Sequence, residues 1–376
     1  MVPVIVLNNE QEIKPELIKE RPTSNSKNQF RYKVKDVDLM NFTKNIQTQI
    51  TSGVSILRAL ETQTIETNTI LSKVAKELIH SLTGGNSLSE SLESFPNIFS
   101  PLYKNLVKAG EHSGKLDKIL EEIANYLEWK IKMKKIIKKA VSYPIFIFTL
   151  TFFSLLFILG FVFPKLSVLF EKIGNELPAH ARFLIKSGEF VSQYWWFILT
   201  AYFVVFLLAY LTFRYGWGKN IFFKILENLP IMGNAVRSLE LSRFLKTLSI
   251  LEASGIPFVK ALGLTRGVLD NPKLVNAIEE IEKKILQGSN FSEALESTNI
   301  MPPMVLNLIS VGEESGKMTD SLKRLAMHFD EDAKEKIAKA LTILEPAMIL
   351  FIGIFVALIT GSVISTLYKA VILAGR

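Results

Sequence analysis

Two short segments of the sequence hold carboxylates, a hydroxyl group and a lysine close enough together to suggest chemistry. The segments are GEHSGK at 110–115 and GEESGK at 312–317. A phosphate-binding loop has four residues between its glycines and then Gly-Lys-Ser/Thr, but only three residues separate Gly110 from Gly114. We therefore interpret each segment as a turn that ends a helix, with Gly114 and Gly316 in the left-handed conformation.

The same turns have a second interpretation, as a contact surface for a partner or as a carboxylate site for a cation. A cation would bind to the acidic side chains of the two segments. The candidate contact residues are charged and fall at matching positions: Glu111, Lys115, Glu313, Glu314 and Lys317. The sequence leaves this interpretation open beside the structural one.

The other polar residues predict neither a catalytic centre nor a bound cofactor. Cysteine is absent, which excludes disulfides, cysteine-based zinc sites and thiol nucleophiles. The four histidines, His80, His112, His180 and His328, lack the spacing of metal ligands. The acidic run at 330–332 is interpreted as a solvated helix face that balances nearby lysines. We expect a protein that is not an enzyme.

Three long uncharged runs account for much of the 48% hydrophobic content. They cover residues 144–163, 194–213 and 346–368. Each is long enough to cross about 30 Å of hydrocarbon as a helix, whereas a buried core helix is usually shorter and tolerates polar breaks. The sequence therefore predicts three transmembrane helices.

The distribution of basic residues predicts which polar segments face the cytoplasm. Six lysines lie between Lys130 and Lys139, just before the first run, while residues 164–193 carry four basic residues interspersed with three glutamates. By the positive-inside rule, 164–193 is an external loop, the amino terminus is cytoplasmic and the carboxyl-terminal tail, 369–376, is external. The formal charge of +8 is then a topology signal that also attracts anionic membrane lipid, and we expect no direct contact with nucleic acid.

The polar segments form an internal repeat at a spacing of about 202 residues. TSGVSILRALE at 51–61 aligns with ASGIPFVKALG at 253–263, and LVKAGEHSGKLDKIL at 106–120 aligns with LISVGEESGKMTDSL at 308–322. Apolar residues recur at three and four positions in both copies, a pattern typical of helices. The predicted fold class is therefore all-α: a polytopic membrane protein with two repeated cytoplasmic helical-bundle domains and three transmembrane helices.

Each copy contains signals for individual helix ends. Ser87 with Glu90, and Asn290 with Glu293, have the spacing of an N-cap followed by a carboxylate three residues later. A long helix from about Leu116 is expected to lead directly into the first span, and its counterpart from about Met318 into the third. The expected segments are a flexible leader, the first domain, the second domain and the tail, at 1–34, 35–143, 214–345 and 369–376, with the three spans and the external loop between them.

Small residues recur every four positions in the third span, at Gly353, Ala357, Gly361 and Ser365. Such a ridge lets membrane helices approach closely. The neighbouring helix is left open: another span of this chain, a second copy or a substrate helix. The absence of ionisable residues inside the three runs argues against a transporter or channel, which remains the alternative function.

The chain resembles the polytopic inner-membrane platform proteins of bacterial type II secretion and type IV pilus machines. The resemblance runs from about Lys35 to the carboxyl terminus. Its most specific motifs are SGIP at 254–257, FSEAL at 291–295, VGEESGKM at 311–318 and LEPAMILFIG at 344–353. The leader, 1–34, is shorter and more polar than that of the family.

The resemblance implies a scaffold in the bacterial inner membrane. Its expected partners are a hexameric assembly ATPase, pilin or pseudopilin subunits, other inner-membrane assembly proteins and further copies of the chain. We further hypothesise that Glu111 and Glu313 mark equivalent surfaces of the two domains, one of which faces the ATPase. Charge reversal at either residue is then expected to abolish filament assembly without lowering membrane abundance.

Overall fold

The computed structural model describes residues 34–65, 69–162, 164–165, 179–215 and 232–374, and these residues form helices without a strand. The first half contains α1 (Asp36–Thr51), α2 (Ile56–Thr62), α3 (Ile70–Thr83), α4 (Leu88–Leu92), α5 (Pro101–Ser113), α6 (Leu116–Phe157) and η1 (Ile158–Val162). The second half contains α8 (Ala179–Tyr215), α10 (Met232–Ala253), α11 (Phe258–Arg266), α12 (Pro272–Leu286), α13 (Phe291–Glu296), α14 (Pro303–Glu314) and α15 (Met318–Ala374). The all-α prediction is confirmed.

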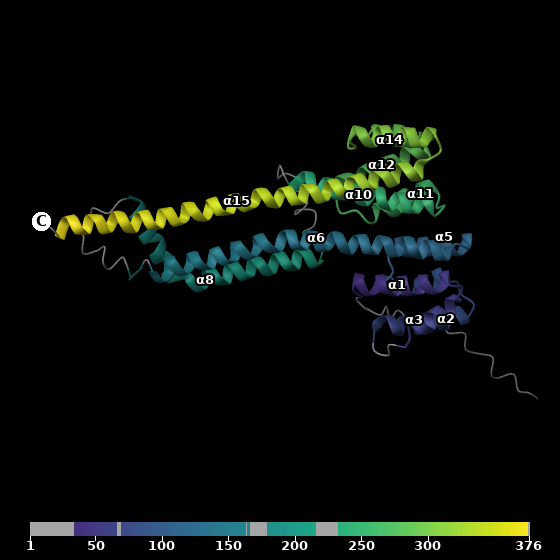
Figure 1. The fold of residues 1–376 in the computed structure, drawn as a ribbon, viewed down its shortest axis with the longest axis horizontal. Coiled ribbons are helices and arrows are strands. Elements are labelled where there is room, and N and C mark those ends of the chain that lie inside the picture. The colour runs from purple at the N-terminus through teal and green to yellow at the C-terminus, as the bar shows by residue number, and fades with distance from the viewer. Residues whose placement is uncertain (1–33, 66–68, 163, 166–178, 216–231, 375–376) are drawn as a thin grey trace, which may run out of the picture.

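The two repeats form two helical domains, one on each side of the pair made by α6 and α15 (Figure 1). In the first domain α1 and α5 contact the first half of α6, and α2 to α4 complete the bundle. In the second domain α10 and α14 contact the first half of α15, and α11 to α13 complete the bundle. Apolar residues at helical spacing fill both cores. Phe99 and Phe244 are among the largest fully buried side chains, one in each domain. The burial of such side chains stabilises each domain by about 1.5–3 kcal/mol per residue.

The helices α6 and α15 run without a break from the domains into the apolar segments (Figure 1). Both continue through a proline, Pro144 in α6 and Pro346 in α15. Proline removes one backbone donor, and the rest of the helical hydrogen bonds persist around it. The predicted starts at Leu116 and Met318 are confirmed, as is the direct connection into the spans.

Three helices are long and apolar enough to cross a membrane, in the ranges Leu116–Val162, Arg182–Leu208 and Met318–Ser365. The first two pack together: the Tyr202 hydroxyl lies 3.0 Å from Thr149 Oγ1, and its ring stacks on Phe152 with centroids 4.8 Å apart. The backbone at Tyr194 interrupts helical geometry within α8. It lies where the second span is predicted to begin.

Helices extend beyond the predicted spans into the predicted external loop and tail. Helix α8 begins at Ala179, inside the predicted external loop 164–193, and α15 continues to Ala374, through most of the predicted tail 369–376. The residues 1–33 of the predicted leader, together with 166–178 and 216–231, lie outside the described residues. Composition marks where apolar character ends, whereas a helix can extend further, so the bounds of the external loop and tail stay a prediction.

Candidate functional site

The two GE-x-SG-K turns join α5 to α6 and α14 to α15, at the ends of the domains farthest from the carboxyl terminus (Figure 1). Gly114 and Gly316 have φ values of 66° and 67°. This is the left-handed region, which glycine enters with little strain. The predicted role of both glycines as helix-ending residues is confirmed.

The first glycine of each turn allows the two helices to approach closely. A Cβ atom built at Gly110 would lie 3.1 Å from Ile119 Cβ, and one at Gly312 would lie 2.5 Å from Ser321 Oγ and 2.8 Å from Ser321 Cβ. Real Cβ atoms are not found at the latter distances. The position therefore requires glycine in the second domain, whereas a side chain at Gly110 would need its neighbours to shift by a few tenths of an ångström.

The glutamate of each turn binds the start of a short helix in its own domain. Glu111 accepts hydrogen bonds from the backbone N–H groups of Leu88 and Ser89, at 2.6 and 3.0 Å. These are two of the amides that a helix start leaves without an intrahelical partner. The carboxylate thus ties α4 to the end of α5.

Glu313 makes the equivalent tie in the second domain. It accepts from the N–H groups of Phe291 and Ser292, at 2.7 and 3.0 Å, and from Ser292 Oγ at 2.5 Å. Partial burial acts to raise the pKa of Glu313, but these hydrogen bonds outweigh it and the pKa is lowered. Sequence reasoning did not find this role, although the repetition of the glutamate in both copies was the available signal.

The predicted N-caps are confirmed in only one domain. Ser87 and Glu90 form a reciprocal capping box at the start of α4. Asn290 is at the cap position of α13 but makes no side-chain capping bond, so that part of the prediction is wrong. At this helix start the Glu313 carboxylate accepts from backbone N–H groups, as Glu111 does in the first domain, and also from the Ser292 hydroxyl.

The other candidate contact residues are at the surface. Lys115, Glu314 and Lys317 are exposed, and Glu314 accepts a hydrogen bond from Ser310 Oγ at 3.1 Å. They therefore present charge at the tips of both domains, while Glu111 and Glu313 are half-buried and engaged within their domains. Contact of any of the five residues with a partner stays a prediction.

The small-residue ridge of the third span points away from the rest of the described chain. A Cβ atom added at Gly353 or Gly361 would meet nothing within 4 Å, and Ala357 is exposed. The helix instead buries Met348 and Ser362. Within the described residues, another span of this chain does not cover the ridge at Gly353, Ala357 and Gly361, whereas its last member, Ser365, is half-buried.

The two domains meet through Trp129 of α6. Its indole Nε1–H donates to Asp330 Oδ1 on α15 at 2.7 Å, and Lys246 Nζ of α10 lies 5.6 Å from the ring centroid. A cation over an indole face is attracted to it electrostatically. Trp129 therefore connects both halves of the molecule.

The acidic run 330–332 was interpreted as a solvated face that balances nearby lysines. The lysine pairing is confirmed for Asp330 and Asp332, which pair with Lys334 and Lys336, but the solvated face is wrong for these two residues. Asp330 binds Trp129, and Asp332 accepts hydrogen bonds from Ser238 Oγ and Lys336 Nζ, both at 2.6 Å. Their side chains are only 19% and 25% exposed. Charge alone predicted a solvent-facing run because the contacting residues are far away in sequence. Trp129 of α6 is 201 positions from Asp330, and Ser238 of α10 is 94 positions from Asp332.

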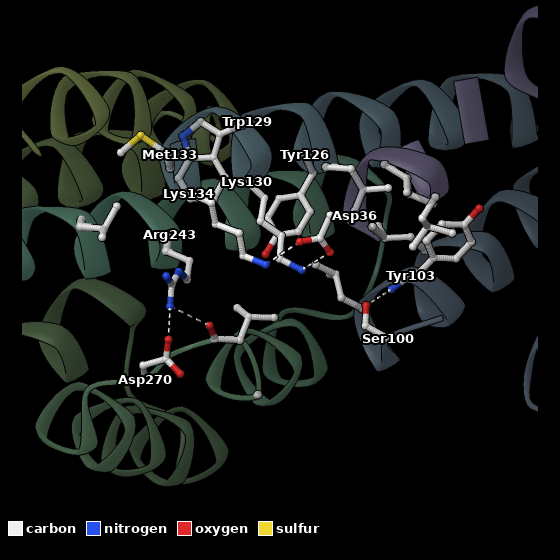
Figure 2. Close-up of a pocket in the computed structure, with 18 of the residues that line it drawn as sticks. Asp36, Ser100, Tyr103, Tyr126, Trp129, Lys130, Met133, Lys134, Arg243 and Asp270 are labelled. Carbon is white, nitrogen blue, oxygen red and sulfur yellow. Dashed lines mark hydrogen bonds and ion pairs between the residues drawn. The ribbon is translucent and has the colours of Figure 1, made fainter. Parts of the chain in front are cut away.

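A cavity of about 390 Å³ lies between the domains, lined by residues of both (Figure 2). On its first-domain side Lys130 and Lys134 converge on Asp36, at 3.0 and 2.5 Å. On its second-domain side Arg243 binds Asp270 at 2.8 Å. These charges are paired with one another, as buried and half-buried charges require, which favours a structural role for this cavity.

One further carboxylate is almost fully buried. Glu240 accepts hydrogen bonds from the N–H groups of Asp270 and Asn271, at 3.0 and 3.2 Å, and pairs with Arg243 at 2.9 Å. Burial raises the pKa of Glu240, and the guanidinium of Arg243 opposes this shift. These contacts fix the start of α12 against α10. Among the described residues, no group of three or more histidine, aspartate or glutamate side chains is placed to hold a metal ion.

These features define a polytopic membrane protein built from a duplicated helical domain. Its sequence matches the family described as "Type II secretion system (T2SS), protein F" over residues 42–164 and 244–366. The chain belongs to this family. The second matched range begins 202 residues after the first, which confirms the duplication.

Three relatives cover most of the chain. It is 31% identical to the type IV pilus assembly protein PilC of Thermus thermophilus, over 89% of this chain and 82% of the relative. It is 29% identical to PilC of Pseudomonas aeruginosa, over 92% and 91% of the two chains. It is 30% identical to the type II secretion system protein F of Aeromonas hydrophila, over 90% and 88%. With its three spanning-length helices, the chain is a multi-pass inner-membrane protein.

Proposed function

We propose that the chain is the platform protein of a type IV pilus or type II secretion machine, with its amino terminus in the cytoplasm and its carboxyl terminus outside. In this role it couples a hexameric cytoplasmic assembly ATPase to the insertion of pilin or pseudopilin subunits into a filament. Other inner-membrane assembly proteins complete the machine. The family and the names of the relatives support this role.

The observation that carries the proposal is the continuity of α6 and α15. From the tip of each domain to the proline at the membrane entry, each helix rises by 28 residue steps, from Leu116 to Pro144 and from Met318 to Pro346. At 1.5 Å per residue this is about 42 Å of uninterrupted helix. A displacement at a domain tip is thereby carried into the bilayer, as in other rigid-body transitions.

We place the ATPase contact at the exposed charges of the tips, Lys115, Glu314 and Lys317. In this proposal Glu111 and Glu313 hold the turns that present those charges. Charge changes at the two glutamates are therefore expected to act through folding of the domain, which differs from the result first hypothesised for them. The ridge at Gly353, Ala357 and Gly361 is proposed to pack against a helix from outside this fold, in a second copy or a client subunit.

The test is charge reversal at each tip in the native host. K115E and K317E are expected to leave the amount of protein in the membrane unchanged, while at least one of them abolishes filament assembly or secretion. K73E is the matched control, because Lys73 is an exposed lysine of α3 away from both turns. Normal assembly in both tip variants would contradict the proposed contact. Solute flux through liposomes containing only the purified protein would favour a channel or transporter instead.

A further inference from the structure

A second cavity, of about 610 Å³, lies between α6, α10 and α15 and is strongly basic. Its lining includes five lysines: Lys132, Lys135, Lys139, Lys246 and Lys334. The only acidic residues in the described lining are Glu128 and Asp330, which leaves a net charge of +3. An uncompensated charge of this size attracts anions.

Two of the lysines already have partners, and three do not neutralise a carboxylate. Lys132 pairs with Glu128 and Lys334 with Asp330, each at 2.6 Å. Within the described parts of the chain, Lys135, Lys139 and Lys246 make no ion pair. Burial lowers the pKa of Lys246, and nearby carboxylates only partly oppose this shift. An anion in the cavity would relieve this excess of positive charge.

The end of the cavity nearest the apolar segments, at Lys139, lies at the depth of lipid headgroups. Lys139 precedes Pro144, where the apolar segment of α6 begins, by five residues, or about 8 Å along the helix. The headgroup region extends roughly 5–8 Å beyond the hydrocarbon on each side of a bilayer. A lysine side chain at this position reaches the phosphates of the adjacent leaflet.

The side of α6 that carries Lys135 and Lys139 becomes apolar further along the helix, towards its carboxyl end. Lys135 and Lys139 are followed at intervals of four, three and four residues by Tyr143, Phe146 and Leu150. Residues at this spacing share one side of a helix. The three apolar side chains are 50%, 64% and 55% exposed, so this side of α6 is uncovered by the described chain.

We propose that this cavity binds the headgroup of an anionic phospholipid, with an acyl chain along Tyr143, Phe146 and Leu150. Lys135 and Lys139 hold the phosphate, and Lys246, deeper in the cavity beside Trp129, adds to its positive charge. The cavity is lined by helices of both domains, and the Trp129–Asp330 hydrogen bond that joins them lies deeper in it than the proposed headgroup. The proposal requires only that α6 and α15 enter a bilayer, and it stands or falls independently of the proposed role in filament assembly.

The test uses the full chain, purified in neutral detergent and titrated with dioleoyl-phosphatidylglycerol. We expect saturable binding that K135Q/K139Q weakens by about tenfold or more, since a lysine near a membrane surface contributes substantially to the attraction of anionic lipid. The matched control is K138Q/K339Q, which removes the same charge from exposed lysines near the membrane entry that do not line the cavity. We expect it to change binding by less than about twofold, because a lysine outside the cavity makes no contact with the headgroup.

Three results would overturn the proposal. Equal weakening in the two double variants would mean a diffuse basic surface in place of a site. Equal binding of phosphatidylcholine would exclude recognition of charge, and displacement of the lipid by millimolar inorganic phosphate would indicate a site for small anions. Lys135 and Lys139 are exposed and make no ion pair within the described residues, so an unchanged thermal transition is expected for their variant.

Discussion

The two domains fix their tips in the same way but attach their first helix to the membrane-directed helix differently. At both tips a half-buried glutamate, Glu111 or Glu313, binds two backbone amides of a short helix. Left-handed glycines also recur at matching positions, as in Gly114 and Gly316. The turn geometry is thus identical where the domains present their exposed charges.

Near the membrane the same helix pairing is built from different groups. In the first domain Asp36 on α1 pairs with two lysines of α6. The equivalent residue in the second domain is Ser238 on α10, which donates to Asp332 and accepts from Lys336, both on α15. The carboxylate of the pairing is therefore on the first helix in the first domain, as Asp36, and on the long helix in the second domain, as Asp332. The repeats therefore share a tip and differ in how their long helices are held, so equivalent substitutions are expected to have unequal effects there.

The largest expected effect lies at Trp129, which has no counterpart in the other repeat. The residue 202 positions later is the exposed Glu331. W129A removes a buried ring and the hydrogen bond to Asp330, and should lower the free energy of unfolding by about 3–5 kcal/mol. Thermal unfolding of the purified chain measures this loss. E331A is the control and should change stability by less than about 0.5 kcal/mol; equal effects would show that the domains do not meet through Trp129.

The tip glutamates should give effects that match between the domains. E111A and E313A each leave two amides of a helix start without their acceptor, at a cost of about 2 kcal/mol in the domain concerned. Limited proteolysis of the purified protein should show faster cleavage in α3 to α5 for the first variant and in α12 to α14 for the second. Wild-type protection combined with lost filament assembly would instead assign the glutamates to a partner contact.

Alanine substitution of the glycine before each of those glutamates should destabilise the two domains to different extents. G312A forces a Cβ atom to 2.5 Å from Ser321 Oγ, whereas G110A brings one to 3.1 Å from Ile119 Cβ. We expect G312A to cost about 1–3 kcal/mol, as for other overpacked sites, and G110A to cost less. Adding S321A to G312A should recover part of the loss, because the nearest atom is then removed. The thermal transition of each variant measures its loss of stability. A larger loss for G110A than for G312A would contradict this prediction.

The smallest expected effect is the pH dependence of the Asp36 pairing. Burial acts to raise the pKa of Asp36, but Lys134 and Lys130 outweigh it and the pKa is lowered. The pairing therefore stabilises the folded state fully above the ordinary aspartate value of 3.8, and this contribution is lost as the pH falls through the lowered pKa. D36N should cost about 0.5–1 kcal/mol at pH 7, because the lysines are partly exposed.

The difference between the wild type and D36N should shrink as the pH falls below 3.8 towards the lowered pKa of Asp36. Unfolding curves of both proteins between pH 7 and about pH 3 give the comparison. S238A is the matched variant of the second domain; it removes a hydroxyl and leaves the Asp332–Lys336 pair in place. Its effect at pH 7 should persist in high salt, whereas that of D36N should shrink. A D36N penalty that is constant with pH would exclude the ion pair as its cause.

Local patterns in the sequence predicted the helix starts at Leu116 and Met318 and the helix-ending glycines, because such signals depend on neighbouring residues. The repeat and the apolar runs were sufficient to predict the all-α, three-span architecture. The hydrogen bond between Leu88 and Glu111 joins residues 23 positions apart in sequence, and the one between Trp129 and Asp330 joins residues 201 positions apart. Such contacts depend on how helices pack, which spacing along the chain does not encode. The repeat could nevertheless have pointed to Glu111 and Glu313 as a structural pair.

The central claim is that both domain tips lie on the cytoplasmic side of one membrane, each joined to a span by an unbroken helix. The chain contains no cysteine, so single cysteines can be introduced without a background. Labelling intact cells with a membrane-impermeant maleimide tests K115C, K317C and H180C directly. We predict that H180C reacts from outside and that the two tip variants react only after the cells are opened. Reaction of both tips in intact cells, with H180C protected, would contradict the account.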